Sequence, residues 1–435
     1  MRKHAHSLLI AMAVLATLGS AAAAQDWNPF DPFANDRKRE EERKRAQEER
    51  DKAKDDSEGD TVVPQAPAGD AFSVERSELT PVMATDGSGL PYELWQGLDV
   101  AKLEGLIAEI EIPPRSPALH ALWLRLITSN VTRPAGGATD QQFMALRLET
   151  LYRSGLLEKA SQELANETSR DALVATLAAR NEIGQGKKIE GCATAQSGGA
   201  PGSGFPKHLR GQAALISGYC AAVAEDAAGA GLAAEMAREE GLAGSAGVRA
   251  LDAVAAGSKP KLAADQPISL LDYRLLEVAG AKMDTGAMLK QAAPSLLAAL
   301  ALDPNSPAEL KLAAAENAAH LNAISPEELA QIYRTSGPNG GGDAKGATAE
   351  KRAALFVAAE TEVTPLKKVR LIRSFLDDAR RAGLYLTALR MIAPAAHSLT
   401  PAPEIGWFAE TGVEIALAAG DYDTCLLYTS DAADE

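Results

Sequence analysis

Apolar residues recur at helical spacing along most of the chain, from about residue 77 onward. Residues three and four apart lie on the same face of a helix, so each such stripe predicts an amphipathic helix. No window of the sequence sustains the alternation of apolar and polar positions that a strand requires. The pattern therefore predicts an all-α fold for residues 77–424. Two of its stripes are Leu94, Leu98, Leu103, Leu106, Ile107 and Ile110, and Leu119, Leu122, Trp123, Leu126 and Ile127.

Several predicted helices begin with residues that favour a helix N-terminus. Ser306-Pro307-Ala308-Glu309 and Ser325-Pro326-Glu327-Glu328 each combine a capping Ser, a Pro at the first helical position and a Glu at the third. The Ser oxygen accepts a backbone N–H that has no partner inside the helix, and Pro needs no such partner. Ser116-Pro117 and Thr364-Pro365 are weaker versions of the same signal. We expect helices to start at these four positions.

Three segments resemble the turn of a tetratricopeptide repeat, where a small residue ends the first helix and an Ala in the second allows close contact. These segments are 155–160, 383–388 and 420–424; each begins with Gly, and the first two end with Ala. The full repeat consensus does not occur between residues 160 and 380. The sequence therefore predicts a divergent, tetratricopeptide-like α-solenoid over residues 77–424.

Residues 1–24 have the three parts of a secretory signal peptide. A basic start, Met1-Arg2-Lys3, precedes an apolar run from Leu8 to Leu18, and Ala21–Ala24 provide a small-residue cleavage site. The apolar run is shorter than the roughly 18–20 residues that span a membrane. We expect cleavage after Ala24, export to the periplasm or the exterior of a Gram-negative bacterium, and no stable membrane insertion afterwards.

Residues 25–76 differ in composition from the rest and predict a charged, low-complexity tail and linker. Residues 37–54 are dense in charges of both signs and lack the apolar seam of a coiled coil. A largely disordered tail is one interpretation of this composition. The other is a tether that docks on a partner through the aromatic residues Trp27, Phe30 and Phe33.

Residues 425–435 resemble translated sequencing adapter more than native protein. In one reading frame, a transposase-type library adapter encodes Cys-Leu-Leu-Tyr-Thr-Ser-Asp-Ala-Ala-Asp, which matches residues 425–434 in order. We therefore expect the native sequence to stop at Thr424 and the natural C-terminal region to be missing.

Composition narrows the classes of function. The 435 residues include 44 basic and 59 acidic side chains, which gives a formal net charge of −15. Removal of Arg2 and Lys3 with the signal peptide would make this charge −17. So acidic a chain does not predict the basic face of a dedicated nucleic-acid binder, and we expect no nucleic-acid partner.

Cys192 and Cys220 are the pair of cysteines that we expect to be joined. Export would place them in an oxidising compartment, where two thiols close in sequence usually form a disulfide. Two free, buried thiols are the alternative interpretation. A redox-active pair is disfavoured because the two residues lack Cys-x-x-Cys spacing.

The sequence does not predict a catalytic, metal or cofactor site. His120, His208, His320 and His397 remain after signal cleavage, and no two of them are spaced as metal ligands on one helix face. We interpret His120 and His320 as partly buried structural residues. The chain also lacks a Gly-x-Ser-x-Gly nucleophile turn and a phosphate-binding loop. Three tryptophans fall in helical stripes, and we expect a place in the core for Trp95, Trp123 and Trp407.

Two segments carry a family resemblance: Leu90–Asp99, Leu-Pro-Tyr-Glu-Leu-Trp-Gln-Gly-Leu-Asp, and Ile112–His120, Ile-Pro-Pro-Arg-Ser-Pro-Ala-Leu-His. In them the chain resembles uncharacterised secreted helical proteins of Alphaproteobacteria, over about residues 78–424. Such proteins are sometimes labelled antifreeze-like, but the Ala-Ala-Thr repeat of antifreeze glycopeptides does not occur here. The resemblance implies an exported bacterial protein, and no activity or site residues.

Two functions compete on this basis. The first is a non-catalytic periplasmic scaffold, in which a helical solenoid binds a protein or peptide partner. The second is the helical superhelix of a cell-wall enzyme similar to soluble lytic transglycosylases, with its catalytic domain missing. The native sequence beyond Thr424 would distinguish them, because the second function requires a further domain there.

Overall fold

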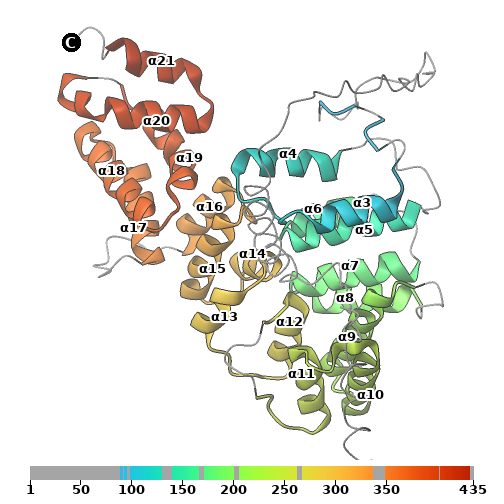
Figure 1. The fold of residues 1–435 in the computed structure, drawn as a ribbon. Coiled ribbons are helices and arrows are strands. Elements are labelled where there is room, and N and C mark those ends of the chain that lie inside the picture. The colour runs from blue at the N-terminus through green and yellow to red at the C-terminus, as the bar shows by residue number, and fades with distance from the viewer. Residues whose placement is uncertain are drawn as a thin grey trace, which may run out of the picture. The chain divides into compact units, whose positions relative to one another are not determined.

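The computed structural model describes residues 89–91, 93–95, 98–129, 140–165, 171–199, 205–261, 267–336, 348–400 and 402–431. Within these ranges the chain forms helices and no strand, which confirms the all-α prediction (Figure 1). The predicted signal peptide (1–24) and the tail (25–76), with its proposed docking residues Trp27, Phe30 and Phe33, lie outside the described residues.

Short connections join most successive helices, and neighbours along the chain pack against each other. The first helices are α3 (Val100–Ala108), α4 (Pro117–Thr128), α5 (Asp140–Arg153), α6 (Leu157–Ala165), α7 (Ala172–Gly184), α8 (Lys188–Ser197), α9 (Lys207–Val223), α10 (Ala227–Ala237), the π-helical turn η1 (Arg238–Leu242) and α11 (Ala246–Ala255). They are followed by α12 (Leu270–Val278), α13 (Thr285–Gln291), α14 (Pro294–Leu302), α15 (Ala308–His320), α16 (Pro326–Ser336), α17 (Ala349–Thr361), α18 (Pro365–Arg381), α19 (Tyr385–His397), the 3-10 helix η2 (Pro403–Phe408), α20 (Ala409–Ala419) and α21 (Tyr422–Asp431).

Capping chemistry explains where several helices begin. At the start of α16, the Glu328 N–H donates to Ser325 Oγ (3.1 Å) and the Ser325 N–H donates to Glu328 Oε2 (2.7 Å). This is the reciprocal capping box that the sequence predicted. Helices α4 and α18 also begin at their predicted Pro. Helix α15 differs, because it begins at Ala308 with Pro307 as its N-cap, which leaves Ser306 outside the helix.

Left-handed glycines end helices at all three predicted repeat turns. Gly155, Gly383 and Gly420 have φ angles of 78°, 77° and 75°. Gly adopts this region without the steric cost that a Cβ would add. Ala160 and Ala388, the small residues predicted in the following helices, are each 1% exposed. Small side chains therefore lie buried at the positions that the pattern selected.

Helix packing is not limited to neighbours along the chain. Helix α14 contacts α5 and α6, and α12 contacts α7. Gly155 approaches Pro294 so closely that an added Cβ would lie 2.8 Å from the Pro294 carbonyl oxygen. Asn322 Nδ2 donates to the carbonyl oxygens of Pro114 and Arg115, at 2.9 Å each. A strictly linear repeat array has contacts only between adjacent units, so this chain adds long-range contacts to such a pattern.

Two clusters of buried residues make up most of the described core. The aromatic core lies mainly among α12–α20. Within it the rings of Tyr333 and Phe356 meet edge to face and those of Phe356 and Phe375 are tilted, with centroids 5.9 and 5.5 Å apart. The alanine core lies among α7 and α9–α12 and holds one buried aromatic residue, Tyr219. Eight of its seventeen buried residues are Ala: Ala179, Ala214, Ala230, Ala233, Ala234, Ala237, Ala246 and Ala250.

The first predicted helices bury narrower faces than their apolar stripes suggest. Helices α3 and α4 each pack mainly against α5, so only one side of each is covered. Leu103, Trp123 and Ile127 are buried. The stripe residues that stay exposed are Leu106, Ile110, Leu119 and Leu122.

No helix of the described ranges has the length and apolar character needed to cross a membrane.

Candidate functional site

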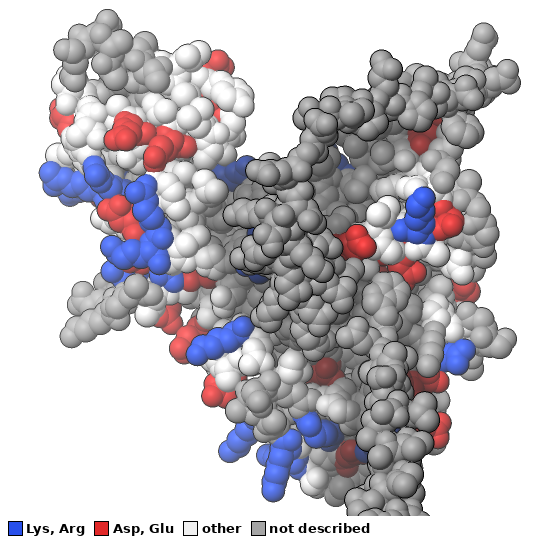
Figure 2. Space-filling view, in the orientation of Figure 1, with Lys and Arg blue, Asp and Glu red and all other residues white. Residues whose placement is uncertain are grey.

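Helix α18 divides its side chains between the aromatic core and solvent. Its buried side includes Val369, Ile372 and Phe375. Lys and Arg side chains gather over α17 and α18 in Figure 2. Because the whole chain carries a net charge of −15, this positive surface reverses the prevailing sign. We use the term basic face of α18 for the exposed residues Lys367, Arg370, Arg373, Arg380 and Arg381.

Trp407 lies beside the basic face, on η2. Its side chain is 44% exposed, and the Arg373 guanidinium carbon lies 5.6 Å from the centre of its ring. The prediction that Trp407 packs in the core is therefore wrong. Its neighbour Phe408 occupies the aromatic core instead, fully buried. Successive residues of a 3-10 helix point about 120° apart, so only one of two adjacent rings can face the core.

Two arginines of the basic face form ion pairs with acidic residues. Arg381 pairs with Asp378 at 2.6 Å, and Arg380 lies 3.9 Å from Glu414. Within the described ranges, the residues of this face that form no ion pair are Lys367, Arg370 and Arg373. Together with the Trp407 ring, these groups form a cationic surface with an aromatic edge.

The structure joins Cys192 of α8 to Cys220 of α9 in a disulfide, as the sequence predicted. The two Cα atoms are 5.5 Å apart, and 28 residues separate the cysteines along the chain. Both half-cystines pack against the edge of the alanine core. The bridge therefore fixes α8 to the neighbouring helix across residues 200–204, which lie outside the described ranges.

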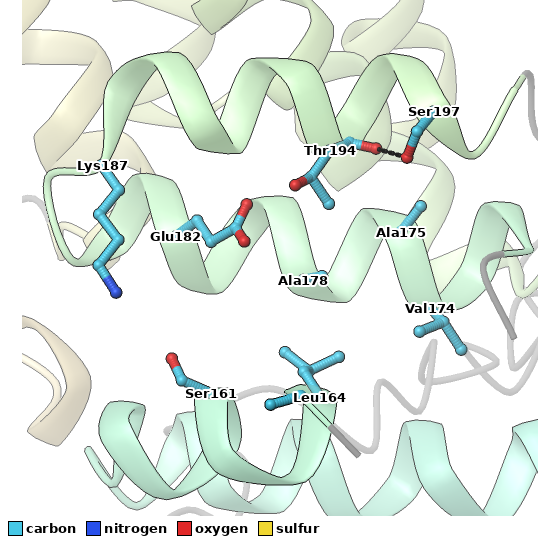
Figure 3. A pocket seen from close by; sticks show the side chains of 10 residues that line it. Ser161, Leu164, Val174, Ala175, Ala178, Glu182, Lys187, Thr194 and Ser197 are labelled. Atoms are coloured by element: carbon cyan, nitrogen blue, oxygen red, sulfur yellow. Dashed lines mark hydrogen bonds between the residues drawn. The ribbon is translucent and has the colours of Figure 1, made fainter. Parts of the chain in front are cut away.

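Helix α8 also forms one wall of a pocket of about 210 Å³, with α6 and α7 as the other walls (Figure 3). Its charged groups, Glu182 and Lys187, lie toward one end, together with Ser161. The other end combines the apolar Val174 and Ala175 with the hydroxyl residues Thr194 and Ser197 (Figure 3). The remaining lining residues are Leu164, Ala165, Val174, Ala175, Ala178, Thr194 and Ser197.

Glycines bring α7 and α8 close enough to form this pocket. A Cβ at Gly191 would lie 2.6 Å from Ile183 Cγ1, and one at Gly198 would lie 2.3 Å from the Ala175 Cβ. Gly186, in the turn between the two helices, has φ of 82°. Larger residues at 191 or 198 would push α8 away from α7, so the sequence sets the width of the pocket through these positions.

The polar side chains of the pocket use only part of their hydrogen-bonding capacity within the described residues. Glu182 Oε2 is shielded from solvent and has no hydrogen-bond partner among the described residues. Ser161 Oγ accepts N–H bonds from Asn181 and Gln185, at 2.9 Å each, so its own hydrogen is left to donate. The Ser197 hydroxyl donates to the Thr194 carbonyl oxygen at 2.8 Å (Figure 3). Such a lining suits the binding of a small polar group that is attached to an apolar body.

His120 and His320 belong neither to the basic face of α18 nor to the lining of the pocket. His120 is half-buried on α4, and burial lowers its pKa. His320, the last residue of α15, is exposed, which contradicts the prediction of partial burial. Its ring faces the turn at Gly383. Within the described ranges, His, Cys, Asp and Glu form no group of three or more that could hold a metal ion.

Three buried arginines were not singled out by sequence reasoning. Arg180 of α7 bonds Glu149 of α5, with side chains 3% and 8% exposed. An Arg in an apolar helix usually extends its charged head to solvent, so the sequence holds no signal that separates a buried Arg from a solvated one. The other two such residues are Arg274, which bonds Asp303 at 2.9 Å, and Arg352, which bonds Glu316 at 2.5 Å.

Comparison of the chain with protein-family models, with curated proteins and with solved structures found no match.

Proposed function

We propose that the protein is a non-catalytic, helical-repeat scaffold of the periplasm that binds acidic segments of partner proteins on the basic face of α18. The observation that carries the proposal is a set of five exposed basic side chains beside the exposed Trp407 ring, in a chain of net charge −15. Charge complementarity guides association and selects the partner. An exposed Trp supplies rigid apolar contact area of the kind that dominates many interfaces.

The charge pattern favours a peptide over an anionic membrane. Asp377 is exposed among the basic residues of α18, and Glu414 lies beside Arg380. A continuous anionic surface would meet these carboxylates as well as the cations. A peptide can place its acidic side chains individually against Arg370 and Arg373.

Two further features support a repeat scaffold in an oxidising compartment. The left-handed turns at Gly155, Gly383 and Gly420 recur at hairpins, which is the behaviour expected of divergent tetratricopeptide-like units. The Cys192–Cys220 disulfide is compatible with export, because disulfides persist where the environment is oxidising.

Binding of a labelled Glu-rich peptide to the full chain tests the proposal. We expect the double variant Arg370→Glu/Arg373→Glu to raise the Kd about tenfold or more, because two attractive contacts become repulsive. Binding by the native chain should weaken as salt rises, since exposed charges are screened over about 10 Å at 0.1 M ionic strength.

The matched control is Lys259→Glu/Lys261→Glu, which makes the same charge change at two exposed residues after α11. Equal loss of peptide binding in both double variants would show that only net charge matters and would contradict the assignment to α18. Vesicles of anionic phospholipid form a separate arm. Tighter binding to vesicles than to the peptide, lost in the α18 variant, would replace the peptide with a membrane surface.

A further inference from the structure

The pocket between α6, α7 and α8 has an arrangement of charge that the proposed scaffold function does not use. Glu182 carries a shielded carboxylate oxygen without a donor among the described residues. Leaving such a buried acceptor unpaired has a free-energy cost, which a ligand with a suitable donor would remove. The pocket therefore contains an unmet acceptor inside a walled space of about 210 Å³.

Lys187 supplies the opposite charge at the same end of the pocket (Figure 3). The two residues are linked through the backbone, where the Lys187 N–H donates to the Glu182 carbonyl oxygen at 2.9 Å. Their side chains nevertheless form no ion pair with each other. The Ser161 hydroxyl, which can still donate, lies near them. This end of the pocket thus offers an acceptor for a cation and donors for an anion.

The other end offers apolar contact. Leu164 and Ala178 line the middle of the pocket, and Val174 and Ala175, which are almost fully buried, line the far end beside Thr194 and Ser197 (Figure 3). Most binding pockets combine such apolar walls with a few polar groups that orient the ligand. A ligand that fits both ends carries an ammonium and a carboxylate close together, and a short apolar side chain on the same centre.

We propose that this pocket binds a small apolar α-amino acid. The ammonium donates to Glu182, the carboxylate is held by Lys187 and Ser161, and the side chain lies against Leu164 and Val174. The Cys192–Cys220 disulfide holds α8, which contributes Thr194 and Ser197 to the opposite wall. The site shares no residue with the basic face of α18, so its test does not depend on the scaffold function.

Calorimetric titration of the disulfide-bonded full chain with L-valine tests the site. We expect saturable binding, and a Kd about tenfold higher or more in Glu182→Gln and in Lys187→Gln, because each loses a charge-assisted hydrogen bond. Isobutylamine and isovalerate, which each keep the apolar part and one charged group of valine, should both bind more weakly than valine. Ala178→Leu should abolish binding, because it places a larger side chain in the middle of the pocket (Figure 3).

The matched controls are Glu190→Gln and Lys188→Gln, which remove one charge each from exposed residues of α8 that do not line the pocket. These variants should bind valine as the native chain does. Three results would overturn the proposal: no saturable binding of valine to the native chain, equal affinity in Glu182→Gln and Glu190→Gln, or equal affinity for valine and isobutylamine. Circular dichroism of each variant, matched to the native spectrum, shows that the effect is not a loss of folding.

Discussion

The alanine core and the aromatic core stabilise similar helix hairpins by different physical means. In the alanine core, small residues let helices approach until backbone and side chain touch, and a Cβ added at Gly218 would lie 2.5 Å from Leu251 Cδ1. In the aromatic core, the rings of Tyr333, Phe356 and Phe375 fill the space between helices. An aromatic ring removes far more apolar surface from water than a methyl group does, so the alanine core gains less from each side chain that it buries.

The two cores are also reinforced differently. A disulfide lies at the edge of the alanine core, where it limits the freedom of the unfolded chain. The aromatic core instead encloses a network in which Arg352 donates to Glu316 Oε1 and Oε2 at 2.8 and 2.5 Å and lies 3.4 Å from Asp378. The Tyr333 hydroxyl donates to the same Glu316 carboxylate at 2.6 Å. The disulfide reinforces the alanine core alone, whereas buried charges also occur on its helices, at Arg180 of α7 and Arg274 of α12.

Removing one partner of the buried network should have the largest effect on stability. Glu316→Ala leaves Arg352 with only part of its charge compensated, and breaking a buried ion pair in this way costs about 3–5 kcal/mol. Hydrogen exchange resolved by region should show lost protection in α15–α18 and retained protection in the alanine core. Urea unfolding followed by circular dichroism gives the total loss.

The control for this variant is Glu360→Ala, in the same region. Glu360 pairs with Arg334 at 2.6 Å, but the Arg side chain is 41% exposed. Pairs with a solvent-exposed partner contribute about 0–1 kcal/mol, so this loss should be several-fold smaller. Similar losses for the two variants would show that burial does not distinguish the network from a surface pair.

Removal of the disulfide should cause the second-largest loss of stability, and this loss should fall on the alanine core. Cys192→Ser/Cys220→Ser frees a loop closed over 28 residues of sequence, which the chain-entropy model values at about 3–4 kcal/mol. We expect increased hydrogen exchange in α8–α11 and little change around Phe356. Cys425→Ser provides the control, because Cys425 takes no part in the Cys192–Cys220 disulfide. Unchanged exchange in α8–α11 would mean that packing alone holds the alanine core.

Substituting glycines should give a smaller effect, whose sign depends on packing. Gly218→Ala adds a methyl group 2.5 Å from Leu251 and should destabilise the alanine core by about 1–3 kcal/mol. Gly105→Ala, inside α3, meets no atom within 4 Å and should stabilise by about 0.5–1 kcal/mol through helix propensity. Thermal unfolding of both variants measures the difference. Stabilisation by Gly218→Ala would show that the helices can move apart at little cost.

The smallest effect we expect is a loss of folding stability at low pH that comes from protonation of Asp378. Burial raises the pKa of this carboxylate, but the hydrogen bond from Arg381 and the charges of Lys351 and Arg352 outweigh burial and lower the pKa overall. A lowered folded-state pKa contributes stability above the ordinary Asp value of about 3.9, and this contribution is lost as pH falls through the lowered value. Urea midpoints at neutral pH and below about pH 4 should therefore differ less in Asp378→Asn than in the native chain. An unchanged difference would assign the acid sensitivity to other groups.

Local sequence signals anticipated much of the fold because they act over a few residues. Helical spacing predicted the class, and the Ser325–Glu328 box and the left-handed Gly155, Gly383 and Gly420 lie where the pattern placed them. Cys192 and Cys220 could be paired because they are close in sequence and because the N-terminal residues predict export. Each of these predictions depends on neighbouring residues or on composition, and distant packing does not alter it.

The candidate sites were much less accessible to sequence reasoning. The sequence shows the basic residues of α18, but their role as a binding surface depends on the exposure of Trp407. The sequence pattern predicted that Trp407 lies in the core, whereas the structure has Phe408 there. The pocket at Glu182 forms from α6, α7 and α8 together. In sequence its Glu and Lys are indistinguishable from solvated surface charges, because nothing local shows which carboxylate oxygen loses its water.

By itself, then, the sequence determined the helical class, many helix and turn positions and the disulfide, since hydrogen bonding, capping and chain closure are governed by short-range chemistry. The tertiary structure alone decided that α14 returns to α5 and α6, that Arg352 is buried between two carboxylates, and that Trp407 faces solvent. These features depend on which faces of distant helices meet, and in an Ala-rich chain many faces are nearly equivalent in their apolar pattern. Burial by a distant helix converts an ordinary Arg or Glu into a structural or binding group, and only the packed molecule specifies that burial.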